Sequence, residues 1–170
     1  MTILFAYDGS ESADAAITGA RDLLGSRGID AVVLSVWEPL VVEALRAMRF
    51  GGRLPMLPDV ADVDAQSEDE ARQVAEHGAR LAGEAGFEAR PLWVADTRAI
   101  ADTIVEGADE LDVDLIVLGA RGLAGIRAFL GSVSNHVLQH AHRPVLVIPA
   151  KTATSTAPEK DRPETAATVS

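Results

Sequence analysis

The sequence contains no cysteine and has far fewer basic than acidic side chains. The absence of cysteine excludes disulfide bonds, thiol catalysis and metal centres held by cysteine. With 15 Lys and Arg against 26 Asp and Glu, the formal net charge is −11, which argues against a nucleic-acid-binding surface, because phosphate contacts along a polymer need clustered Lys and Arg. A single nucleotide is not excluded, because backbone amides can hold its phosphates without any net positive charge.

Long apolar runs are also missing. No run approaches the length needed to span a bilayer, and Met1-Thr2 leads straight into a predicted strand without a basic or signal-like segment. We therefore expect a cytoplasmic protein that does not associate with membranes. A chain of 170 residues is long enough to bury a core of its own as one domain.

Apolar runs and helical periodicity alternate along the chain. The predicted strands are Thr2–Tyr7, Ala31–Val36, Phe87–Val94, Leu115–Leu118 and Pro144–Ile148. The predicted helices are about Ser12–Leu24, Asp69–Gly83, Arg98–Leu111 and Ser132–His140. This alternation predicts an α/β fold, with one doubly wound, mainly parallel five-stranded sheet flanked by helices. Pro91 indicates that its strand is interrupted or lies near an edge.

Two segments are less regular. Residues 38–68 include a possible short helix from Val41 to Phe50, and the Gly- and Pro-rich run that follows, residues 51–58, cannot continue it. A connection of this length is either a surface excursion or a functional lid, and the residues favour neither. From Lys151 onward, Thr, Ala, Ser, Pro and charged residues dominate, so we expect a domain over residues 1–150 and a disordered tail over 151–170.

The segment from Val113 to Ser134 carries the main chemical signal. A short apolar strand is followed by glycines at positions 119, 122, 125 and 131, and a helical pattern begins directly after the last one. A strand, a glycine-rich loop and a helix N-terminus form an anion site, because the first-turn N–H groups are free and the helix dipole is positive there. Ser132 and Ser134 add hydroxyl groups at the same place. The alternative is that the glycines only permit a tight turn from strand to helix.

These residues resemble the nucleotide-binding motif of the universal stress protein (UspA-like) family, in its ATP-binding subgroup. The family pattern has two glycines separated by two residues, nine further residues, and then Gly followed by Ser or Thr. Here Gly119 and Gly122 are followed by only eight residues before Gly131-Ser132. The resemblance extends to Ile3–Ser10, Asn135–Leu138 and Arg143–Pro149, and it covers about residues 1–150.

The resemblance implies a fold like that of the adenine-nucleotide α-hydrolases and a site for ATP with Mg. The residues that it places around the nucleotide are Ala6, Tyr7, Asp8, Val36, Gly119, Arg121, Gly122, Gly131, Ser132, Val133 and Ser134. By this likeness the Gly131 and Ser132 amides hold phosphate, Asp8 meets the ribose side or the metal, and the Val36 backbone reads the adenine edge. Asp8 is equally explained by an Asx turn that satisfies its own loop.

No catalytic group stands out. The sequence has no Walker-type Gly-Lys-Ser/Thr and no nucleophile elbow around Ser10. His136 and His140 have the spacing of metal ligands on one helix face, but no carboxylate is evidently placed to complete a site, and we expect none. We expect a non-enzymatic ATP-binding stress-response or regulatory protein, with at most weak ATP hydrolysis.

The resemblance also implies a homodimer that pairs through the C-terminal strand Pro144–Ile148, together with a regulatory protein partner that the sequence does not identify. Two alternatives stay open. One is a dimer of the same family that binds proteins and not nucleotides, and the other is a slow ATPase or nucleotidyl-transfer enzyme.

Overall fold

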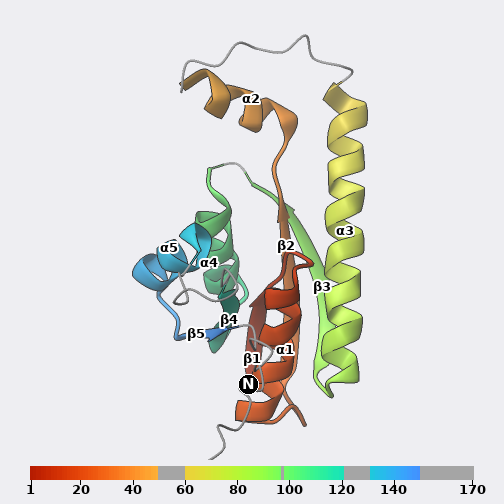
Figure 1. Cartoon of the computed structure of the whole chain (residues 1–170), viewed down its shortest axis with the longest axis vertical. Helices are drawn as coiled ribbons and strands as arrows, with labels where there is room; N and C mark the ends of the chain where they lie inside the picture. Colours follow the sequence, from red (N-terminus) through yellow and green to blue (C-terminus); the bar gives the residue numbers. More distant parts are fainter. Residues whose placement is uncertain (50–59, 97, 121–130, 150–170) are drawn as a thin grey trace, which may run out of the picture.

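The computed structural model describes residues 1–49, 60–96, 98–120 and 131–149 of the chain. Strands and helices alternate along most of it (Figure 1). The strands are β1 (Thr2–Ala6), β2 (Asp30–Trp37), β3 (Glu88–Ala95), β4 (Leu115–Ala120) and β5 (Val145–Pro149). The helices are α1 (Glu11–Leu24), α2 (Leu40–Arg49), α3 (Val60–Glu84), α4 (Ile100–Glu110) and α5 (Ser132–His140).

All five strands form one parallel sheet in the order β3-β2-β1-β4-β5. The predicted α/β doubly wound fold is therefore confirmed. β1 lies in the centre, and its residues Ile3, Leu4 and Phe5 are completely buried or nearly so, as expected for a strand covered on both faces. β3 is an edge strand, which confirms the edge position that Pro91 predicted.

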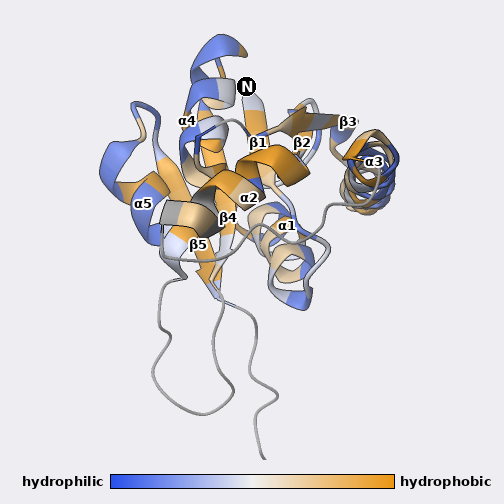
Figure 2. Ribbon diagram, turned by 90° about the horizontal axis from the view of Figure 1, so that it is seen from above, coloured by the Kyte–Doolittle hydropathy of each residue, from blue (hydrophilic) through white to orange (hydrophobic). Residues whose placement is uncertain are grey.

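Helices cover the two faces of the sheet separately (Figure 2). α1 and α3 pack on one face, over a core that includes Ile3, Phe5 and Val117. α4 and α5 pack on the other face, over a core that includes Leu4 and Ile116. Successive strand residues thus alternate between two hydrophobic cores, which is why the inner strands β1 and β4 are almost continuous apolar runs in the sequence.

The connection between β2 and β3 differs from the prediction. α3 begins at Val60, not near Asp69, and it is 25 residues long, so much of the irregular segment predicted over residues 38–68 is helical. The short helix predicted near Val41 exists as α2, and the backbone N–H of Leu40 at its start donates to the carboxylate of Asp64 in α3 at 2.7 Å. Residues 50–59 and the predicted tail, residues 151–170, lie outside the described residues.

Only the second half of α3 contacts the core. Its buried residues recur at helical spacing from Ala71 to Ala82, whereas most of its first half lies beside α2, beyond the end of the sheet (Figure 1). Just before Ala71 the helix still reaches the sheet, because Trp93 Nε1 of β3 donates to Glu68 Oε1 at 3.3 Å. Within the part of the chain that the structure describes, no helix is long and apolar enough to cross a membrane.

Candidate functional site

A pocket of about 280 Å³ opens at the carboxyl ends of β1, β2 and β4. After β1 the chain continues to one side of the sheet through β2, and β4 lies on the other side. This is the point where the strand order reverses, and open parallel sheets bind ligands in the crevice at this point. The starts of three helices, α1, α4 and α5, complete the wall.

Nine of the residues predicted from the sequence line this pocket, namely Ala6, Tyr7, Asp8, Val36, Gly119, Gly131, Ser132, Val133 and Ser134. Arg121 and Gly122 lie outside the described residues, as does the shortened loop between Gly122 and Gly131. Sequence reasoning missed six lining residues, which are Ser12, Ala13, Leu34, Ile100, Ile104 and Leu118. Their apolar periodicity marked most of them only as core positions, and nothing local in the sequence shows that they border a cavity.

Gly119 has a clear packing role at the end of β4. A Cβ atom at this position would lie 2.3 Å from the backbone oxygen of Ser12 and 3.0 Å from the backbone nitrogen of Ala13. The absence of a side chain therefore allows the first turn of α1 to rest directly on the end of β4. Because Ser12 and Ala13 also line the pocket, this close approach sets the width of the site.

The start of α5 is tied to the same strand end. The Ser134 hydroxyl, which is largely buried, donates to the backbone oxygen of Gly119 at 3.2 Å. Gly131 occupies the N-cap position, where no side chain caps the helix. The first backbone bond of the helix runs from the Asn135 N–H to the Gly131 oxygen, so the N–H groups of residues 132–134 have no acceptor within the helix. Because Ser132 is exposed, its hydroxyl stands at the entrance to this site.

The start of α1 is capped by a neighbouring side chain. The Ser10 hydroxyl accepts a bond from the Ala13 N–H at 3.3 Å, and it donates to Asp8 Oδ1 at 2.6 Å. Asp8 Oδ1 also accepts from the Ser10 N–H at 3.1 Å, so the Asx turn that the sequence allowed at this position exists. Ser12 lies 2.9 Å from Ser10, hydroxyl to hydroxyl. The two helix starts therefore differ, since α1 carries a side-chain cap and α5 does not.

The Tyr7 side chain extends away from the strand ends toward α1 and α3. Its hydroxyl donates to Asp14 Oδ1 at 2.5 Å, and its ring packs where any side chain at Gly78 would have to lie. Burial, and then the bond to Asp14, raise the pKa of Tyr7 well above its usual range. The phenol is therefore neutral at physiological pH and fixes the bottom of the pocket as a donor to Asp14.

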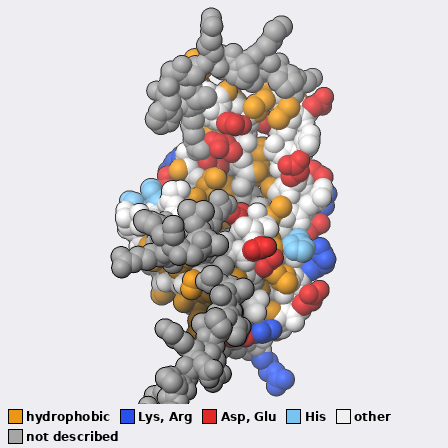
Figure 3. Space-filling model, in the orientation of Figure 1, with side chains coloured by type: hydrophobic (Ala, Val, Ile, Leu, Met, Phe, Trp, Pro, Cys, Tyr) orange, Lys and Arg blue, Asp and Glu red, His pale blue; other side chains and the backbone are white. Residues whose placement is uncertain are grey.

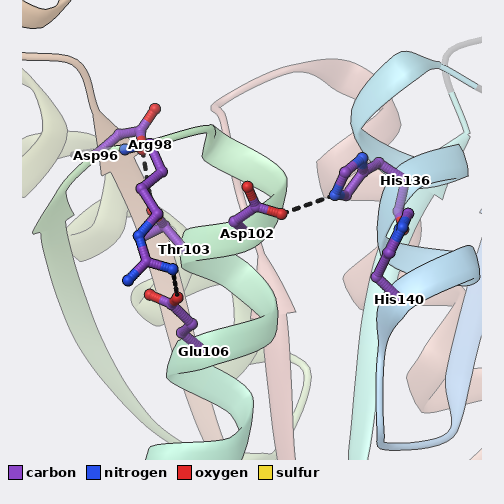
Figure 4. Close-up of polar contacts among 7 residues, drawn as sticks. All are labelled: Asp96, Arg98, Asp102, Thr103, Glu106, His136 and His140. Carbon is purple, nitrogen blue, oxygen red and sulfur yellow. Dashed lines mark hydrogen bonds and ion pairs between the residues drawn. The ribbon is translucent and has the colours of Figure 1, made fainter.

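Asp96 holds the start of α4 (Figure 4). This carboxylate is completely buried at the end of β3, and it accepts bonds from the Arg98 N–H at 2.8 Å and the Thr103 hydroxyl at 3.1 Å. The bonds fix the first turns of the helix, which present Ile100 and Ile104 to the pocket. Asp96 thus positions the apolar wall without lining the pocket itself.

His136 has a carboxylate partner that the sequence did not reveal. Its Nε2 atom lies 2.7 Å from Asp102 Oδ1 of α4, and the ring of His140 stacks on its own at 4.1 Å between centroids (Figure 4). The two partners are 34 residues apart in the chain, so the local sequence gave no signal of the contact. Among the described residues no group of three or more His, Cys, Asp or Glu is arranged to hold a metal ion.

Comparison with known proteins gives a family match over almost the whole described chain. Residues 1–149 match the model of the universal stress protein family. A universal stress protein of Thermus aquaticus is 31% identical over 148 residues, which are 86% of this chain and 97% of that protein. Universal stress protein YxiE of Bacillus subtilis is 28% identical over 151 residues, with the same shares covered.

Solved structures share the fold. The structure of protein MJ0577 covers 87% of this chain and 94% of its own, with a TM-score of 0.65 and 21% identity. A universal stress protein family protein of Arabidopsis thaliana, crystallised with AMP bound, covers 88% and 91% with a TM-score of 0.61 and 17% identity. The universal stress protein of Archaeoglobus fulgidus in complex with dAMP covers 86% and 94%, with a TM-score of 0.53 and 22% identity.

Proposed function

The chain belongs to the universal stress protein family, and from this premise we propose that it binds ATP with Mg²⁺ in the pocket at the strand ends. We further propose that it acts as a homodimeric stress-response or regulatory protein. One observation carries the proposal of a nucleotide site. An uncapped helix start and an apolar wall face the same pocket, at the point of the sheet where strand order reverses.

The phosphates belong at the start of α5. Free N–H groups of residues 132–134 and the positive end of the helix dipole favour an anion there, and the exposed Ser132 hydroxyl adds a donor. The start of α1 is less suited to a phosphate because the Ser10 hydroxyl already accepts a bond from its first turn. The structural difference between the two helix starts therefore gives the ligand an orientation.

The adenine belongs on the opposite side of the pocket. Its wall there is apolar, with Leu34 and Val36 from β2 and Ile100 and Ile104 from α4. A flat, largely apolar ring fits such a surface, with the backbone supplying the polar contacts that orient it. Related structures with AMP and dAMP bound support an adenine nucleotide as the ligand class.

Asp8 is the candidate partner for Mg²⁺. It is the only charged residue among the described residues that line the pocket, and Mg²⁺ is commonly held by one carboxylate together with substrate phosphates and water. Asp8 Oδ1 is engaged by Ser10, which fixes the orientation of the carboxylate. The residues present thus fit a metal that arrives with the nucleotide.

We propose binding without efficient catalysis. Phosphoryl transfer depends on positive groups that stabilise charge on the transferred phosphate. The described pocket-lining residues include no Lys, Arg or His. Mg²⁺ would be the one positive group in such a site, with no described side-chain cation beside it, and this favours binding over efficient transfer.

The test begins with the protein as purified. Nucleotide released by denaturation is identified by chromatography, and the affinities for ATP, ADP and AMP are measured by calorimetry with and without Mg²⁺. The variant Gly131→Val places a branched side chain at the start of α5, where the backbone angle φ of −60° accepts any residue. We expect ATP affinity to fall about tenfold or more, which is at least about 1.4 kcal/mol.

The matched control is Gly83→Ala in α3, where an added Cβ meets nothing within 4 Å. It should bind ATP as the natural protein does. Unchanged ATP affinity in Gly131→Val would place the site elsewhere. A protein that binds no nucleotide at all would favour the protein-binding alternative.

The dimer is proposed to form through β5, the second edge of the sheet. An uncovered edge strand presents unpaired backbone groups to a second copy, and a two-fold axis satisfies them in both chains. Light scattering on Val147→Lys should give a monomer, while Leu138→Lys, at a position on α5 that is 43% exposed, should leave the mass unchanged. A dimer that persists in Val147→Lys would exclude this edge.

A further inference from the structure

We propose that α2 and the first half of α3, here called the arm (residues 40–49 and 60–70), form a docking surface for a basic amphipathic segment of a partner protein. The arm is not part of the pocket wall. α2 contacts α3, and most of the first half of α3 lies beyond the end of the sheet (Figure 1), with one bond to it, from Trp93 Nε1 to Glu68 Oε1 at 3.3 Å. The core therefore does not require the arm to have its particular surface.

The arm carries an exposed apolar stripe. Val41, Leu45 and Met48 follow one another at spacings of four and three residues, so they share one face of α2. Their exposed fractions are 52%, 59% and 48%, whereas Ala44 beside them is buried. Scattered exposed apolar residues are ordinary on protein surfaces, but three in register on one helix match the anchor spacing that helix-in-groove recognition uses.

The surroundings of the stripe are acidic. The described residues 38–49 and 60–70 contain seven Asp and Glu against two Arg. In Figure 3 hydrophobic side chains lie between α2 and the upper part of α3, with Asp and Glu side chains beside and below them. Glu68 and Asp69 lie in the last turn of the arm, within α3. Asp69 forms an ion pair with Arg72, which lies just beyond the arm.

The apolar stripe and its acidic border together indicate which kind of partner segment fits the arm. A second copy of the chain would bring a second arm with the same negative charge, and like charges facing one another oppose association. A partner segment with Lys or Arg around an apolar face satisfies both features, because its apolar side chains cover the stripe while its cations approach the carboxylates. We therefore assign the surface to a basic amphipathic helix.

The probe is a synthetic peptide of about 18 residues containing only Leu and Lys, with Leu at helical spacing. A second peptide of the same composition, shuffled to remove the apolar face, has equal charge and no amphipathic pattern. Binding of both to the full chain is measured by fluorescence anisotropy at physiological salt. We expect the amphipathic peptide to bind about tenfold more tightly than the shuffled one.

Variants locate the site. The double substitution Leu45→Gln/Met48→Gln should remove the difference between the two peptides. The control Leu23→Gln/Leu24→Gln changes residues that are 68% and 42% exposed at the end of α1, and it should preserve the difference. Asp62→Asn/Glu70→Gln should weaken both peptides while leaving their ratio in place. Circular dichroism melting ensures that only folded variants are compared.

Two results would overturn the proposal. If the two peptides bind the natural protein equally, the interaction is a general attraction to an acidic protein. If the amphipathic preference survives in Leu45→Gln/Met48→Gln, or if that variant instead changes the oligomeric mass in sedimentation, the stripe serves another occupant.

Discussion

Replacement of Gly119 by alanine tests the packing that builds the pocket. The new Cβ would lie 2.3 Å from the backbone oxygen of Ser12 and 2.6 Å from the carbon that bears it. A flexible side chain could rotate away, but these are atoms of the first turn of α1. The turn must therefore move as a body, and it carries Ser12 and Ala13 of the pocket wall with it.

The loss of stability expected for Gly119→Ala follows from the rigidity of the α1 backbone that the new Cβ would meet. Overpacking in a well-packed region costs about 1–3 kcal/mol, and a clash with helix backbone belongs at the upper end. For a protein of this size each kcal/mol corresponds to about 2–4 °C in Tm, so we expect Gly119→Ala to melt about 6–12 °C lower. If ATP binds as proposed, the stabilisation that it gives, about 2.7 kcal/mol at a hundredfold excess over its Kd, should also shrink.

Differential scanning fluorimetry with and without ATP measures both effects. Gly83→Ala is the control, because its Cβ enters open space and alanine in a helix stabilises by up to about 1 kcal/mol relative to glycine. If Gly119→Ala melts within a degree of the natural protein, the close approach of α1 to β4 does not set the structure of the site. If it is destabilised but gains as much from ATP as before, the packing role holds and its link to the pocket fails.

Three further substitutions test individual contacts. Ser134→Ala removes the bond to the Gly119 oxygen and should cost about 0.5–1.5 kcal/mol in urea unfolding; an unchanged midpoint would mean that water replaces the bond. Ser10→Ala removes the cap of α1 and should cost about 1 kcal/mol, whereas equal stability would show that water satisfies the Ala13 N–H equally well. Tyr7→Phe tests the raised pKa: the bond to Asp14 contributes stability at all pH values below the unfolded pKa of about 10, and this contribution is lost as pH rises further. The natural protein should therefore lose stability above pH 10 more steeply than Tyr7→Phe, and parallel curves would contradict this.

The sequence predicted the inner strands well because burial on both faces leaves an apolar run in each, whereas the edge strand β3 carries Glu88 and Arg90 among its apolar residues. It also predicted α5 from Ser132 to His140, as the structure has it. The start of α3 was missed because its first half buries little, so no apolar stripe marks it. That half is helical through polar contacts such as the bond from Gln66 to Glu70 at 3.0 Å, and polar periodicity is a weaker signal than burial.

The residues of the candidate site that lie next to strand ends could be predicted from the sequence. Turn residues and glycines after β1 and β4 mark their own positions in the sequence. Contacts between distant segments left no such mark, as for Asp102 with His136, or Ile104 at the pocket. Gly119 illustrates a further limit, because a glycine beside a ligand and a glycine beneath a helix look the same in one sequence.

The crossover from β2 to β3 is long, and the two halves of α3 within it have different structural roles. A parallel crossover needs only a dozen or so residues, yet 50 residues separate Trp37 from Glu88. The half of α3 from Ala71 onward covers the sheet and is constrained by it. The preceding half and α2 bury little and have few bonds to the sheet, such as that from Trp93 to Glu68, so their surface can change with little effect on the strands. If the arm docks a partner as proposed, substitutions that change its surface can therefore accumulate there, while the half from Ala71 onward is held by its packing on the sheet.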